Sequence, residues 1–249
     1  MQMTQTHEIM DVCLLAGKIM LENGAETYRV EDTMARLAAS YGINDAQSYV
    51  TPTGIIFSVD GLTPTKLIRI SERTNNLDKV ATVNSISRKA SEGCLSIKEA
   101  SRELKGAEKL GHATPIPLQI AAAAIASGCF LIMFQGGWGD FIPAFISGGL
   151  GFAGMIYFHH FVKIKFFAEL LASFIIGLTA FLMVSIGIGS ELDKIIIGSV
   201  MPLVPGVVIT NAVRDLMAGH LVSGLSKGAE ALITAFAIGT GIAVVFAIY

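Results

Sequence analysis

The sequence predicts an α-helical integral membrane protein with five transmembrane helices, preceded by a small cytoplasmic α/β domain. Hydrophobic residues make up 52% of the 249 residues and charged residues only 15%, against roughly 25% charged residues in an average soluble domain. Residues 1–116 carry 13 of the 18 Lys/Arg and 14 of the 20 Asp/Glu. The rest contains five uncharged runs of 18–21 residues, and about 20 apolar residues span a bilayer as a helix.

These patterns divide the chain into a domain at 1–110, a linker at 111–117 and a transmembrane domain at 118–249. Pro117 is typical of the first turn of a helix. We expect membrane lipid to surround the helices of the last part. The five spans are predicted at about 117–134, 141–158, 168–190, 195–213 and 229–249.

Charges in the short loops predict the orientation of the spans. The loop 159–165 carries two lysines, and the segment 214–230 carries Arg214 and Lys227. The loop 135–140 has no basic residue, and 191–194 has one lysine against two acids. Because basic loops stay in the cytoplasm, we expect the N-terminus in the cytoplasm and the C-terminus on the outer side of the membrane.

The N-terminal domain shows helical spacing of apolar residues over 7–22 and again up to Gly42. Between these two helices, Asn23 is predicted to cap the second helix, with Glu26 three residues later in the position of a capping box. The β-branched runs that follow Gly42 predict a hairpin or small sheet.

A third helix is predicted over 77–93. Ser96 and Glu99 form a second predicted capping box before a charged helix that ends at Lys109.

Two prolines interrupt the fourth span near its centre. Pro202 and Pro205 each remove a backbone donor, and Gly206 follows. Broken helices often form the substrate site of a transporter, and a half-helix that starts near Gly206 would favour an anion such as a carboxylate. We therefore take Pro202, Pro205, Gly206 and the polar Thr210 and Asn211 as candidate substrate-binding residues. A simple proline kink without a ligand is the alternative.

Charged residues follow this break. Arg214, Asp215, His220 and Glu230 are candidates for a gate or a proton-coupling cluster, because acids near the membrane are often functional and His protonates near neutral pH. The alternative is an interfacial helix in which Arg214 extends to lipid headgroups.

The N-terminal motif gathers polar residues within a short stretch. Its candidate residues are Asn23, Gly24, Glu26, Arg29 and Glu31. They fit a membrane-tethered hydrolase, a regulatory domain that senses substrate, or simply an exposed helix face. The sequence lacks a recognisable nucleophile–base, metal-binding or dinucleotide-binding motif. We therefore expect no enzyme activity, no metal and no cofactor, and the net charge of −2 gives no signal for nucleic acid.

Three separated segments, 21–42, 50–59 and 205–232, resemble the bacterial threonine/serine exporter family of the ThrE/YjjP type. The resemblance covers nearly the whole chain. It implies a cytoplasmic domain, a membrane domain and proton-driven export of threonine and serine, with C4-dicarboxylates such as succinate as the alternative substrates.

The family's long form carries about twice as many spans. The resemblance therefore implies that this chain is the larger subunit of a split form, completed by a smaller membrane-protein subunit. Small residues at Gly148, Gly151 and Gly154 would permit close helix approach, either to that partner or within this chain. A homo-oligomer is the alternative.

Overall fold

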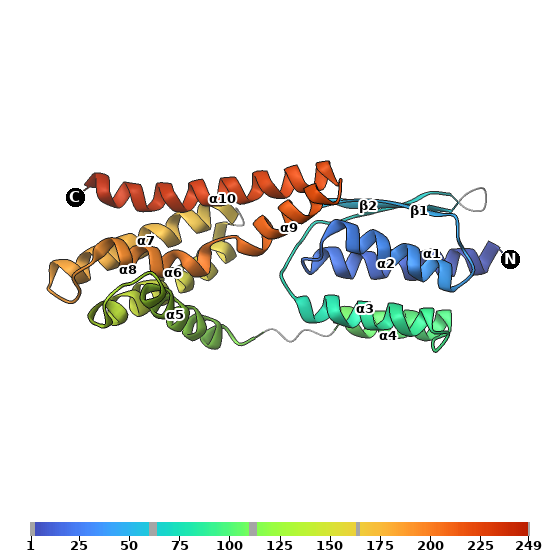
Figure 1. The fold of residues 1–249 in the computed structure, drawn as a ribbon, viewed down its shortest axis with the longest axis horizontal. Coiled ribbons are helices and arrows are strands. Elements are labelled where there is room, and N and C mark those ends of the chain that lie inside the picture. Colours follow the sequence, from blue (N-terminus) through green and yellow to red (C-terminus); the bar gives the residue numbers. More distant parts are fainter. Residues whose placement is uncertain (1–2, 60–63, 110–113, 163–164, 249) are drawn as a thin grey trace. The chain divides into compact units, whose positions relative to one another are not determined.

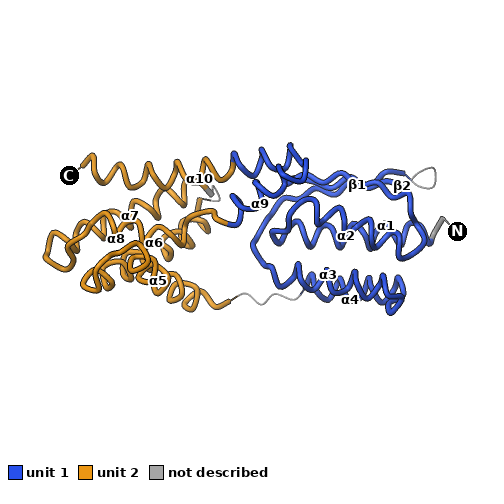
Figure 2. The backbone as a smooth tube through the Cα atoms, viewed as in Figure 1, with its two compact units in different colours: residues 1–112, 207–229 blue, residues 113–206, 230–249 orange. Residues whose placement is uncertain are grey.

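The computed structural model describes residues 3–59, 64–109, 114–162 and 165–248. The chain forms two compact units, which Figure 2 colours separately. The first unit contains residues 1–112 and 207–229, and the second contains 113–206 and 230–249. The first unit thus includes a segment, 207–229, that the sequence analysis placed with the transmembrane part. Part of the predicted linker at 111–117 lies outside the described residues.

The first unit is built in layers. A sheet packs against α1 and α2, and these helices pack against α3 and α4 (Figure 1). The sheet is antiparallel with the order β1-β2-β3, which confirms the predicted small sheet. The elements are α1 (Met3–Glu22), α2 (Thr27–Ser40), β1 (Ala46–Thr51), β2 (Gly54–Val59), β3 (Lys66–Arg69), α3 (Leu77–Ser91), α4 (Ile97–Lys109), α9 (Gly206–Met217) and the start of α10 (Leu221–Ile248).

The core of this unit follows the periodicity of the sequence. Along β2, Ile55 and Phe57 are buried and Ile56 between them is exposed, because successive side chains of a strand face opposite sides. On α1, residues at helical spacing are buried, namely Ile9, Val12, Cys13, Ala16 and Met20. Gly17 allows α2 to approach at Met34. Helix α2 ends just before Gly42, which has a φ of +86° and so adopts the left-handed conformation that glycine tolerates.

The two predicted capping boxes have different outcomes. The box at Ser96 is confirmed, because Glu99 accepts hydrogen bonds from the Ser96 backbone N–H and hydroxyl, at 2.9 and 2.7 Å. The box at Asn23 is wrong. Helix α2 begins at Thr27 with Glu26 as its N-cap residue, and the Glu26 side chain makes no capping hydrogen bond. Asn23 instead donates to the carbonyl of Ile19 at 2.7 Å.

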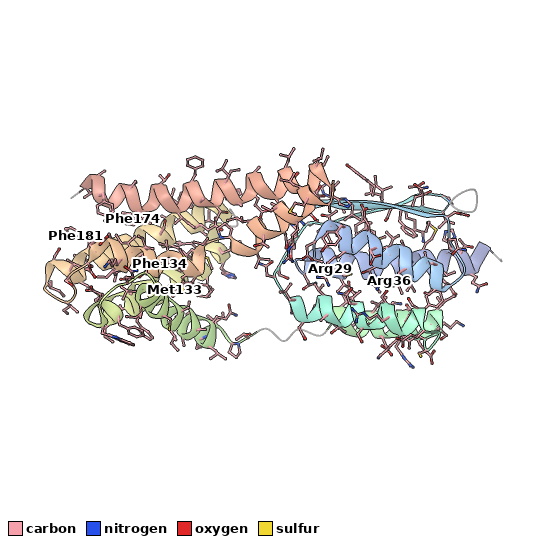
Figure 3. All side chains as sticks on the ribbon, viewed as in Figure 1. Arg29, Arg36, Met133, Phe134, Phe174 and Phe181 are labelled. Carbon is pink, nitrogen blue, oxygen red and sulfur yellow. The ribbon has the colours of Figure 1, made fainter. Side chains whose placement is uncertain are left out.

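The second unit is a bundle of apolar helices. Four helices of the described residues are long and apolar enough to cross a membrane, or five if the bent pair α8–α9 is counted as one span. Figure 3 labels some of the apolar side chains of this unit, among them Phe134 after α5 and Phe174 and Phe181 on α7. Its further elements are α5 (Ile116–Met133), η1 (Trp138–Asp140), α6 (Phe141–Val162), α7 (Lys165–Ser185), α8 (Leu192–Val200) and η2 (Met201–Leu203).

Glycines bring the helices of this unit close together. A Cβ atom at Gly148 would overlap Ser127 of α5, and one at Gly151 would overlap Ile176 of α7. At Gly154, the added atom would lie 2.7 Å from the Ile175 side chain. The three small residues are therefore used for packing within this chain, which was one of the two predicted roles.

The predicted interruption of the fourth span is confirmed. Helix α8 ends at Val200, a 3-10 turn covers Met201–Leu203, and α9 begins at Gly206. The backbone N–H of Val204 donates to Met201 and that of Gly206 to Val204, so tight turns replace the helical hydrogen bonds that the prolines exclude.

Helix α8 receives its N-terminal cap from a distant residue. Asp140 is 1% exposed and accepts hydrogen bonds from the backbone N–H groups of Ser190 and Glu191, at 2.6 and 3.3 Å. The sequence analysis treated the loop 135–140 only as a span connection. A carboxylate at a helix N-terminus compensates for unpaired N–H groups and the helix dipole.

Two glycines of α10 provide a matched test of this packing. A Cβ at Gly241 would overlap the Ser173 hydroxyl and the backbone carbonyl of Leu170, whereas one at Gly239 would meet nothing within 4 Å. We expect Gly241→Ala to lower the melting temperature of the purified full chain in detergent, because backbone atoms must move. Gly239→Ala should leave it unchanged or raise it, since alanine favours helices by about 1 kcal/mol over glycine. Equal melting temperatures for the two variants would contradict this packing.

Candidate functional site

The candidate site lies in the first unit, where α2 meets α9 and the start of α10. Its centre is Asp215, whose side chain is fully buried. One carboxylate oxygen accepts a hydrogen bond from the backbone N–H of Thr27 at 2.9 Å. The other accepts from the Thr27 hydroxyl at 2.9 Å and from Lys227 Nζ at 2.7 Å. Asp215 therefore supplies the N-terminal cap that α2 lacks locally, from 188 residues away.

Lys227 is the residue that the sequence analysis missed as a site residue. Its side chain is only 6% exposed, and its ammonium lies 3.4 Å from the Thr27 hydroxyl as well as beside Asp215. A lysine is rarely buried unless it is paired. The sequence analysis used Lys227 only as a loop charge that indicates orientation. Lys227 and Asp215 are twelve residues apart and lie on different helices, so no helical periodicity connects them in the sequence.

A second ion-pair group adjoins this centre. Arg214 lies 2.5 Å from one oxygen of Glu26, and Arg29 lies 3.1 Å from the other. Burial alone would raise the pKa of the Glu26 carboxyl, but a backbone N–H group and the guanidinium groups of Arg214 and Arg29 outweigh burial and hold the pKa below its ordinary value of 4.5. Glu26 of the N-terminal motif therefore carries a negative charge at neutral pH.

Further contacts tie the N-terminal motif to α9 and α10. Asn211 donates to the carbonyl of Gly24 at 2.9 Å. Glu31 accepts from the backbone N–H of Val50 at 2.9 Å and lies 3.9 Å from His220. The motif thus positions residues from both ends of the sequence and shows no nucleophile–base pair among the described side chains.

The structure brings together many of the predicted candidates, but not all of them. The first unit contains the N-terminal motif together with Asn211, Arg214, Asp215 and His220. Thr210 also belongs to this unit and is exposed. Glu230, Pro202, Pro205 and Gly206 belong to the second unit.

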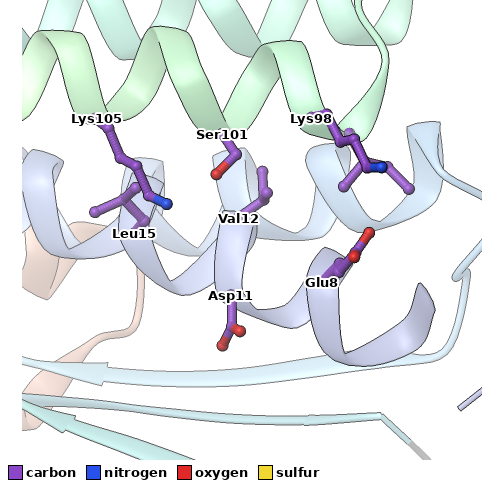
Figure 4. Close-up of a pocket in the computed structure, with 8 residues that line it drawn as sticks. Glu8, Asp11, Val12, Leu15, Lys98, Ser101 and Lys105 are labelled. Carbon is purple, nitrogen blue, oxygen red and sulfur yellow. The ribbon is translucent and has the colours of Figure 1, made fainter. Parts of the chain in front are cut away.

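A separate open groove lies between α1 and α4 and has a volume of about 340 Å³. Figure 4 shows Lys98, Ser101 and Lys105 on α4 and Glu8 on α1 around it, with Asp11 pointing away. Asp11 is paired with Lys66 at 2.5 Å. The groove lies on other elements than the Asp215 site, and its lysines give the α4 side a positive charge.

Comparisons with known proteins match nearly the whole chain. The model of a family described as "Putative threonine/serine exporter" matches residues 11–249. No solved structure matches the chain. Among its relatives are proteins of two different lengths.

Two relatives have about the same length as this chain. A protein of Escherichia coli (strain K12) named "Probable succinate transporter subunit YjjP" is 26% identical, with 100% of this chain and 98% of that protein covered. The protein of the same name from Klebsiella aerogenes is 25% identical, with 93% and 90% covered.

A third relative is longer. The "Probable threonine/serine exporter" of Mycobacterium tuberculosis (strain H37Rv) is 22% identical, with 95% of this chain but only 45% of that protein covered. This chain therefore corresponds to somewhat less than half of that protein.

Glu26 and Glu22 provide a test of this charge arrangement, because the pKa of Glu26 is lowered and that of Glu22 is raised. The lowered pKa of Glu26 means that its charge stabilises the fold above about pH 4.5, and that this contribution disappears as the pH falls through the lowered pKa. We expect Glu26→Gln to reduce the free energy of unfolding at pH 7 by about 1–3 kcal/mol. Melting of the full chain in detergent at pH 7 and pH 4 measures the difference, which should shrink at pH 4.

Glu22 is the matched control, because burial raises the pKa of its carboxyl. Its charge disfavours the folded state at pH 7, so Glu22→Gln should leave stability unchanged or increase it. If both glutamine variants destabilise the protein equally, the ion pairs of Glu26 with Arg214 and Arg29 do not stabilise the fold.

Proposed function

Because the chain belongs to this exporter family and is a membrane transporter subunit rather than an enzyme, we propose that it exports small carboxylate-bearing molecules, driven by the proton gradient. The proposed drive rests on Asp215, whose carboxylate is fully buried and paired with the buried Lys227. Buried acids of transporters are candidates for proton coupling. His220, 3.9 Å from Glu31, is a second protonatable group of the same unit.

The proposed substrates are threonine and serine or, alternatively, a C4-dicarboxylate such as succinate. The family description supports the amino acids. The two relatives that match this chain over at least 90% of their own length are named for succinate, and this favours the dicarboxylate. Either substrate presents a carboxylate, which a half-helix N-terminus binds well.

The proposed substrate path includes the break at Pro202, Pro205 and Gly206. Helix α9 begins at Gly206, so its first turn directs backbone N–H groups and a partial positive charge toward the break. Thr210 and Asn211 follow on α9, although the amide of Asn211 already donates to Gly24. A contribution of the break to binding stays a prediction.

We also infer a smaller partner subunit. The relatives of similar length are named transporter subunits, and the longer relative contains more than twice the length that this chain matches. These lengths and names support the partner subunit. The small residues at Gly148, Gly151 and Gly154 do not add to this support, because they pack within this chain.

The proposed orientation places the N-terminus in the cytoplasm and the C-terminus outside, in a bacterial plasma membrane. The loop charges support it. We expect a tag before Met1 to be protected in sealed spheroplasts and a tag after Tyr249 to be cleaved by external protease. Cleavage of both tags, or of neither, would contradict an odd number of spans. Permeabilised spheroplasts, in which both tags should be cleaved, are the control.

A transport assay tests the proposed function. Proteoliposomes that contain this chain and the proposed smaller membrane subunit should export preloaded labelled succinate, threonine or serine, and the chain alone should show little flux. Collapse of the proton gradient should stop net export. Full flux from the chain alone would point to a homo-oligomer, and no flux of the three compounds with both proteins would refute the export function.

A further inference from the structure

The acidic side chains of α4 are engaged by neighbouring groups. Glu103 lies 3.5 Å from Lys89 of α3 and forms a salt bridge with it. Glu108 forms a second salt bridge, at 2.7 Å, with Lys18 of α1. Glu99 completes the capping box at the start of the helix. Along α4, all of whose residues are described, no carboxylate therefore forms an ion pair with a cation of the same helix.

The basic side chains of α4 form a row along its exposed side. They lie at positions i, i+4, i+7 and i+11, which share one face of a helix, and all four are exposed: Lys98, Arg102, Lys105 and Lys109. Within the described part of the chain none of them forms an ion pair. The row extends about 16 Å, because each residue adds 1.5 Å along the helix. Like charges at these spacings destabilise a helix, and a bound anion would remove that repulsion.

Two adjoining hollows make this row accessible to a ligand. The groove between α1 and α4 is lined on its α4 side by Lys98, Ser101 and Lys105, which Figure 4 shows. A second hollow of about 440 Å³ shares these three residues and adds Arg102 and Lys109. None of the described residues that line the second hollow is acidic, whereas the groove has acids on its α1 side. An anion is therefore accommodated better in the second hollow.

We propose that this row of α4 binds a phosphate-bearing anion of several charges, with the Ser101 hydroxyl as a neutral donor between the lysines. Lysine and arginine are frequent partners of phosphate oxygens. An anion with several phosphates distributes its charge along a row, which a single carboxylate cannot do. The site lies within the first unit and does not depend on the proposed export function.

Two sources present this chemistry. One is a soluble polyphosphate compound. The other is the headgroups of anionic lipids, which attract clusters of basic residues near a transmembrane helix. The row ends at Lys109, seven residues before α5 begins at Ile116. The experiment therefore has one arm for each source.

Titration calorimetry with inorganic tripolyphosphate is the first arm, using the purified full-length chain in phosphatidylcholine nanodiscs. The α4 variant, Arg102→Gln/Lys105→Gln, removes two neighbouring cations of the row. It should bind tripolyphosphate roughly tenfold more weakly than the wild type, because each exposed ion pair contributes up to about fivefold in affinity. Added salt should weaken binding by the wild type, since exposed charges are screened.

A matched control separates the row from the overall charge of the chain. Arg36→Gln/Arg69→Gln removes the same charge from α2 and β3, outside both hollows, and should bind tripolyphosphate like the wild type. Both residues changed in the α4 variant are exposed, so this variant should keep the melting temperature of the wild type.

Flotation is the second arm. The same nanodiscs are mixed with vesicles of phosphatidylglycerol or of phosphatidylcholine and centrifuged in a density gradient. Loss of tripolyphosphate binding in the α4 variant identifies a soluble anion, and loss of co-flotation with the phosphatidylglycerol vesicles identifies lipid headgroups; either loss supports the proposal. Absence of both kinds of binding in the wild type, or losses that are missing in the α4 variant or equal in the control variant, would overturn it.

Discussion

The hydrogen bond from Thr27 N–H to Asp215 is the constraint on which the first unit depends. Helix α2 begins without a side-chain cap of its own, and the first N–H groups of a helix require acceptors. Asp215 supplies one from α9, and the charge that it brings is balanced by Lys227 from α10. One cap therefore determines where three helices meet. Helix α8 begins in the same way in the other unit, where Asp140 accepts from Ser190 and Glu191.

Such an arrangement is a poor way to obtain stability alone. Removal of two charges from water costs several kcal/mol per ion, and an apolar pair of similar size often serves as well or better. The buried Asp215–Lys227 pair is therefore better understood as the connection that joins α2 to α9 and α10. The adjoining Glu26 is held in a similar way, since both of its oxygens contact arginines and its pKa is lowered. Glu26 therefore keeps its charge at neutral pH and links α2 to Arg214 of α9.

The sequence was informative where the determining interactions are local. Apolar length predicted the spans, two prolines predicted the start of α9, and β-branched runs predicted the sheet. The Ser96 box formed because its partner Glu99 is three residues away. The Asn23 box failed because a remote carboxylate satisfies the helix instead. Lys227 could not be recognised for the same reason, since its partners lie 12 and 200 residues away.

The first unit is built from two segments that are far apart in the sequence, and this has a consequence for biosynthesis. Residues 1–112 leave the ribosome well before residues 207–229, which complete the same unit. At 5–20 residues per second, the N-terminal segment waits roughly 5–20 s for the acid that caps α2. Until then the surface that α9 and the start of α10 later cover stays open, while residues 113–206 of the second unit are synthesised. Nascent chains of this protein thus pass through a state in which neither unit is complete, because the first still lacks 207–229 and the second still lacks 230–249.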